Sequence, residues 1–148
     1  MFLLPEYDEI KCRNNVRPIL KRYRRMARIA GRPLTDLRSP IISDMPRSLS
    51  FDNNQEKENS ISVSAKMEVD EINRAVKNLS QECFAVIYYT YLSKEEYTNL
   101  EIASIVFGTI NANKTVERRQ KDGLLQFCES YRHGQLLVYK DRNQSSVL

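Results

Sequence analysis

One short stretch of this 148-residue chain restricts its fold more than any other: residues 97–119, which read YTNLEIASIVFGTINANKTVERR. Apolar residues lead up to Gly108, a short polar segment follows, and a basic run starts the next helical pattern. Such a pattern predicts two helices joined by a tight corner, the second of them polar at its front end. The first is expected from Leu100 to Phe107 with Asn99 as its cap, and the second from about Asn113 to His133, with Gly134 ending it.

A further helix is expected near the start of the chain, from about Val16 to Ala30. Its apolar residues recur every three or four positions and form one face. Asn14 or Asn15 can cap it, and Pro18 would then fall in the first turn, where its missing N–H costs nothing. Gly31 is the expected residue after its end.

Helical periodicity resumes at about Ala65, and a helix capped by Ser80 follows and is broken at residues 93–96. No strand pattern is evident, so the fold class is all-α. We expect a C-terminal helix-turn-helix domain, preceded by a basic N-terminal helix. The predicted divisions are a basic helical region (1–47), a polar Ser- and Asn-rich linker (48–64), the C-terminal domain (65–137) and a tail (138–148).

The charge of the chain is concentrated near its start. Residues 11–47 hold eleven basic and two acidic residues, a net charge of +9, whereas the whole chain carries +4. A split of this kind indicates contact with a nucleic acid or a membrane surface. The basic residues of the first helix would add phosphate contacts or touch RNA polymerase: Lys21, Arg22, Arg24, Arg25 and Arg28.

The second helix of the corner has the pattern of a helix that reads DNA. Five residues form an inward stripe on this helix: Val116, Gly123, Leu124, Phe127 and Tyr131. Polar side chains crowd the first turns, and they are the candidate DNA contacts: Asn113, Lys114, Thr115, Glu117, Arg118, Arg119 and Lys121. Arginine reads guanine, Asn reads adenine, Glu accepts from cytosine, and Lys suits phosphates. Taken alone, the pattern also fits an amphipathic hairpin with a solvated outer face.

Enzyme, cofactor, metal and membrane classes find little support. The cysteines Cys12, Cys83 and Cys128 lack metal-ligand spacing, so we expect buried small hydrophobes in a reducing cytoplasm. His133 is the one histidine and falls at a helix end, where it can cap. The longest apolar run, FAVIYYTYL, is shorter than the roughly 20 residues of a membrane span. The chain is therefore expected to be a non-enzyme without cofactors.

Several segments together resemble the ArpU/RinA-like family of phage transcriptional regulators, over nearly the whole chain. They are LSQECFAVIYYTYL, NLEIASIV, TVERRQKDGLLQFCESYRHGQLLVYK and the N-terminal VRPILKRYRRMARIAGRPLTDLRSPIISDMP. The C-terminal half of that family is similar to region 4 of sigma factors, a helix-turn-helix module. The resemblance implies a sequence-specific activator of phage or prophage late genes that binds double-stranded DNA near a promoter in the bacterial cytoplasm.

One departure from the helix-turn-helix pattern bears on the site. From Ala103 to Thr115 the chain is about three residues longer than a typical 3–4-residue turn allows. The cap of the second helix is therefore open between Asn111, Asn113 and Thr115. Two other functions also stay open: a DNA-packaging protein of the small-terminase type, and a module that binds RNA polymerase or a sigma factor. Association into homo-oligomers stays open as well.

Overall fold

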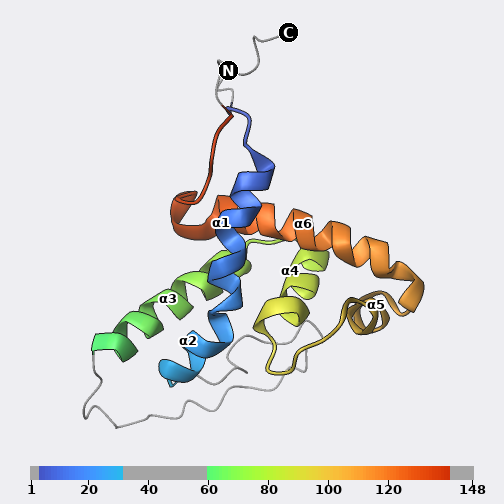
Figure 1. Cartoon of the computed structure of the whole chain (residues 1–148), viewed down its shortest axis with the longest axis horizontal. Coiled ribbons are helices and arrows are strands. Elements are labelled where there is room, and N and C mark those ends of the chain that lie inside the picture. The colour runs from blue at the N-terminus through green and yellow to red at the C-terminus, as the bar shows by residue number, and fades with distance from the viewer. Residues whose placement is uncertain (1–3, 32–59, 141–148) are drawn as a thin grey trace.

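The computed structural model describes residues 4–31 and 60–140, and these residues form helices around one core (Figure 1). The α-helices are α1 (Glu9–Lys21), α2 (Tyr23–Ile29), α3 (Ser60–Val76), α4 (Gln81–Ile87), α5 (Asn99–Phe107) and α6 (Asn113–Ser130). Three shorter turns join or extend them: the π-helical η1 (Tyr88–Leu92) and the 3-10 turns η2 (Ile110–Ala112) and η3 (Tyr131–His133). Within the described residues there is no strand, which confirms the all-α prediction.

The N-terminal helix begins earlier than the sequence indicated. Asp8 caps it by accepting a hydrogen bond from the backbone N–H of Lys11 at 3.2 Å, so Asn14 and Asn15 lie inside the helix. Pro18 lies within α1 rather than in its first turn. The helix forms in spite of this proline because one face is buried at four-residue steps, through Cys12, Val16 and Leu20. The helix is interrupted at Arg22, and α2 follows. Gly31 comes just after the end of α2 and has a φ of +69°, which confirms its predicted role as the residue that follows the helix end.

The basic N-terminal helices share their core with the rest of the molecule. In Figure 1, α1 crosses α6 near the C-terminal end of α6, α2 runs along α3, and α4 packs beneath α6. At the crossing, the Cys128 thiol lies against the Cys12 thiol, and both side chains are fully buried. All three cysteines are buried and free, as predicted.

Two later helices also differ from their predicted limits. The helix α3 begins at Ser60, inside the predicted linker; residues 32–59, which hold the rest of that linker, lie outside the described residues. Met67 lies on the outer side of α3, where it is 63% exposed. The helix after Ser80 changes to a π-helical turn at Tyr88 before it ends at Ser93, in the break that was predicted.

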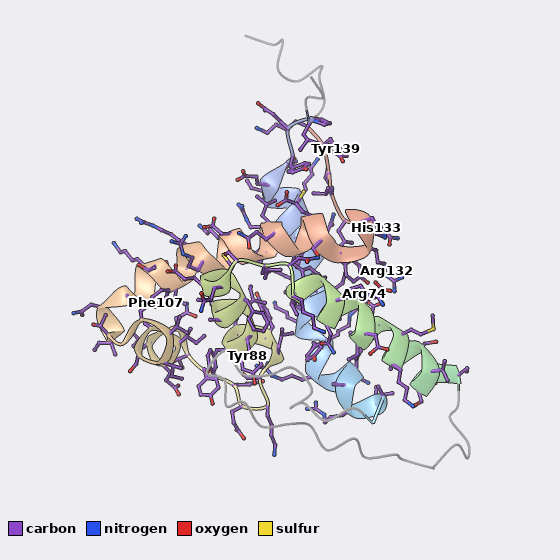
Figure 2. All side chains as sticks on the ribbon, turned by 180° about the vertical axis from the view of Figure 1, so that it is seen from behind. Arg74, Tyr88, Phe107, Arg132, His133 and Tyr139 are labelled. Atoms are coloured by element: carbon purple, nitrogen blue, oxygen red, sulfur yellow. The ribbon has the colours of Figure 1, made fainter. Side chains whose placement is uncertain are left out.

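The two ends of the described chain lie together above the crossing of α1 and α6. The Asp8 N–H donates to the Val138 carbonyl at 2.7 Å, and the Lys140 N–H donates to the Glu6 carbonyl at 2.9 Å. Between them, Tyr7 and Tyr139 form an isolated antiparallel bridge; Tyr139 is labelled in Figure 2. The start of the predicted tail is thereby attached to the start of α1.

Candidate nucleic-acid interface

The helix α5 begins with a capping box. The Thr98 hydroxyl accepts from the backbone N–H of Glu101, and the Glu101 carboxylate accepts from the backbone N–H of Thr98, both at 3.3 Å. The predicted cap, Asn99, is the first residue of the helix instead. Thr98 caps the helix in place of Asn99 because the residue three positions after Thr98 is a glutamate. The carboxylate of Glu101 accepts a hydrogen bond from a second backbone N–H that the helix leaves free. Gly108, with a φ of +76°, ends α5 in the left-handed conformation.

The corner between α5 and α6 is a short 3-10 turn. The Thr109 hydroxyl accepts from the backbone N–H of Asn111 at 3.2 Å and so caps η2. The helix α6 follows at once, with Ala112 in its cap position and no side-chain cap. None of the three predicted caps (Asn111, Asn113 and Thr115) therefore has that role. The extra length noted in the sequence forms η2.

The predicted inward stripe of α6 is confirmed. Val116, Leu124, Phe127 and Tyr131 are buried in the core. Gly123 lies against α4, where a Cβ atom would come within 2.6 Å of Ile87 Cγ1. The close approach of α4 and α6 therefore favours glycine at this position.

Two polar residues next to this stripe tie α6 to its neighbours. The Gln120 side-chain amide donates to Thr90 Oγ1 at 3.0 Å and to Asn99 Oδ1 at 2.9 Å, which joins α6 to η1 and to the start of α5. Sequence reasoning missed Gln120, although its place one turn after Val116 puts it on the inward face.

Arg119 is the second tie, although it was predicted as a DNA contact. Its Nε lies 2.7 Å from Glu82 Oε2 on α4, and another guanidinium nitrogen lies 3.1 Å from Asp122 Oδ2. The hydrogen bond to Glu82 raises the pKa of the Arg119 guanidinium. The structure thus gives this side chain two carboxylate partners within the protein.

The remaining charged candidates form one outward stripe on α6, which we call the α6 stripe. Its members are all exposed and follow one another at helical steps: Lys114, Glu117, Arg118 and Lys121. None of these side chains forms a hydrogen bond or an ion pair with another of the described residues. Four uncommitted side chains, three of them basic, thus share one face of the first turns of α6.

The two other candidates at the front of α6 point elsewhere. Thr115 is half-buried on the flank of the helix. The side-chain oxygen of Asn113 is buried and accepts no hydrogen bond from the described residues. Asn113 therefore does not present that oxygen on the outer surface with the α6 stripe.

Arg24, one of the five predicted accessory residues, has a role inside the fold. Its guanidinium donates to the carbonyl oxygens of Ser93 at 2.7 Å and Thr90 at 3.3 Å, at the end of η1. A third bond reaches the Glu95 carbonyl at 3.5 Å. Burial lowers the pKa of this guanidinium. Arg24 holds α2 against the end of η1, whereas the other accessory residues (Lys21, Arg22, Arg25 and Arg28) are exposed.

Over residues 4–31 and 60–140, no group of three or more His, Cys, Asp and Glu side chains is placed to hold a metal ion. No helix among those residues is long and apolar enough to cross a membrane.

Comparison with known proteins identifies a relative along almost the full length of the chain. A protein of Enterococcus hirae named "Putative autolysin regulatory protein ArpU" is 34% identical over 140 residues. The alignment covers 95% of this chain and 100% of the relative. No protein-family model matches the sequence, and no solved structure matches it.

Proposed function

The chain belongs to the ArpU family of regulatory proteins, and from this premise we propose that it is a sequence-specific DNA-binding transcription regulator. In this proposal α5, η2 and α6 act as a helix-turn-helix, and α6 enters the major groove. The observation that carries the proposal is the α6 stripe, a set of uncommitted charged side chains on the front turns of a helix whose back is fixed by the core.

Each member of the α6 stripe has a role that its chemistry suits. Arg118 would donate two hydrogen bonds to a guanine, and Glu117 would accept from a cytosine amine. Lys114 and Lys121 would neutralise phosphates on either side of the groove. The uncapped start of α6 adds backbone N–H groups that favour a phosphate. Arg119 and Gln120 would contribute indirectly, by fixing the rotation of α6 about its axis.

The proposal also includes the DNA site and the genes that the protein would regulate. The resemblance of the chain to phage regulators points to a promoter-proximal site and to activation of phage or prophage late genes. An activator must hold its DNA and also influence RNA polymerase, so the proposal includes the polymerase as a partner. The bacterial cytoplasm is the compartment in which both would be met.

An electrophoretic shift tests the DNA part directly. The purified chain would be mixed with fragments that tile its own gene and the adjacent late promoter, with excess nonspecific competitor at physiological salt. We expect one fragment to be retained, and Arg118→Ala to abolish its retention. The matched control is Lys77→Ala, which removes one exposed positive charge from the segment after α3, away from the α6 stripe.

Salt dependence separates the base contacts from the phosphate contacts. Lys121→Ala should lower the slope of log affinity against log salt by about one, because one fewer counterion is released. Equal binding to every fragment would contradict sequence-specific recognition by α6. Ring-shaped oligomers in light scattering would instead support a packaging protein of the small-terminase type.

A further inference from the structure

A second charged surface lies on the N-terminal helices. Its members are exposed and recur at one-turn steps along the outer side of α1 and α2, and we call them the basic stripe: Lys21, Arg22, Arg25 and Arg28. The Arg22 side chain donates to the carbonyl of Pro18, in the last turn of α1, at 3.2 Å. Apart from that bond, none of the four forms a hydrogen bond or an ion pair with another described residue. Like charges one turn apart repel one another and destabilise a helix.

The basic stripe is nevertheless held on a rigid support. On one side, Arg24 donates to the carbonyl oxygens at the end of η1. On another side, the Tyr23 hydroxyl donates to Asn73 Oδ1 on α3 at 2.7 Å. Because Tyr23 and Arg24 are consecutive, these two anchors fix α2 on both neighbours and leave the basic stripe facing outward. A helix fixed in this way binds a partner with little further loss of backbone entropy.

The basic stripe and the α6 stripe lie on different sides of the molecule. The α6 stripe faces away from α4, whose Ile87 meets the opposite side of α6 at Gly123. The helix α2 lies on the α4 side, against η1 and α3 (Figure 1). Arg25 is 13 residues beyond Cys12, where α1 crosses α6, and this is about 20 Å measured along the axes of α1 and α2 in turn. A straight duplex on the α6 stripe would therefore leave the basic stripe uncovered.

We propose that the basic stripe docks on an acidic protein surface while α6 holds the DNA. Arginine is enriched at protein interfaces and lysine is depleted, and the basic stripe has three arginines to one lysine. Ile29, next to Arg28, is 43% exposed and adds an apolar contact that a phosphate backbone would not use. The proposal rests on the proposed function, in which the acidic surface belongs to the transcription machinery.

The test uses the full chain and purified bacterial RNA polymerase holoenzyme in biolayer interferometry, with the target duplex measured in parallel. The double variant Arg25→Glu and Arg28→Glu should lose about tenfold or more of the affinity for polymerase. Its affinity for the duplex should stay within about twofold, as for a charge remote from that interface. The matched control, Arg118→Glu with Lys121→Glu, makes the same change of charge and should show the reverse pattern. Thermal unfolding of both variants establishes that each is folded.

Four results would overturn the proposal. Equal loss of duplex affinity in both double variants would make the basic stripe a phosphate contact. Unchanged polymerase binding in the Arg25/Arg28 variant would show that the basic stripe does not contact polymerase. Absence of polymerase binding by the natural chain would show that polymerase is not the partner. A change of oligomeric state in light scattering would assign the basic stripe to a second copy of the chain. If the natural chain binds polymerase but not the duplex, the proposed DNA-binding function is wrong. The docking proposal is then tested by the polymerase measurements with the Arg25/Arg28 variant.

Discussion

Replacing Gly123 by alanine tests how closely α4 and α6 are packed. The added Cβ would lie 2.6 Å from Ile87 Cγ1 and 3.1 Å from Ile87 Cδ1, whereas ordinary van der Waals contact begins at 3.4 Å. Overpacking of this kind costs about 1–3 kcal/mol. Alanine in place of glycine within a helix returns about 1 kcal/mol. We therefore expect Gly123→Ala to lower the free energy of unfolding by about 1 kcal/mol.

The sign of that effect should reverse when the opposing side chain is shortened. Ile87→Ala removes both atoms that the new Cβ would meet, and by itself it should cost about 2–5 kcal/mol because Ile87 is fully buried. In that background only the helix preference of alanine remains, so Gly123→Ala should stabilise the protein by about 1 kcal/mol. The coupling between the two positions is then about 2 kcal/mol, within the range for residues in contact.

Urea unfolding followed by circular dichroism measures all four corners of this cycle. The control background is Ile87→Val, which keeps a Cγ atom near Gly123 and should leave Gly123→Ala destabilising. The reasoning is refuted if Gly123→Ala has the same effect in the natural and the Ile87→Ala backgrounds. In that case the cost at Gly123 would come from something other than contact with α4.

Three further predictions concern other parts of the fold. Arg24→Met should lower the free energy of unfolding by about 2–3 kcal/mol in a urea titration, since it removes a charged donor from three carbonyl oxygens; Arg25→Met, the exposed control, should stay within about 0.5 kcal/mol. His133 has a φ of +59°, so His133→Gly should raise stability by about 1 kcal/mol, and a lower melting temperature would show that the imidazole makes a compensating contact. Burial raises the pKa of the Cys128 thiol from 9.0 to about 12; the unfolded state therefore binds fewer protons between these pH values, and stability should fall as pH rises through them. Cys128→Ala should weaken that alkaline loss, and an identical pH dependence in both proteins would contradict the assignment.

The inner faces of the helices could be predicted from sequence because burial follows helical periodicity. Val116, Leu124 and Phe127 were identified in this way, and all of them are buried. Helix limits were harder to predict because they depend on competition between neighbouring signals. Pro18 suggested a start at Val16, but the packing of the α1 face outweighs the hydrogen bond that proline removes.

The candidate contacts show a different limit of sequence reasoning. Arg24 and Arg25 are adjacent and chemically identical, yet one is lodged at the end of η1 and the other is exposed. In the same way, Arg118 faces outward while Arg119 binds Glu82. Helical geometry predicts that neighbours point in different directions, but only the positions of α4 and η1 determine which of them finds a partner.

These ties also explain why the α6 stripe faces outward as a unit. Successive residues of a helix are separated by about 100° of rotation. Arg119 and Gln120 engage α4, η1 and α5, so a shift of register by one residue would break the ion pair with Glu82 and the hydrogen bond to Thr90 together. It would also turn Arg118 toward α4. The direction of the α6 stripe is thus fixed by contacts on the other sides of α6. Under the proposed function, substitutions at Gln120 should therefore weaken the retention of the target fragment in an electrophoretic shift, although Gln120 is not itself a proposed base contact.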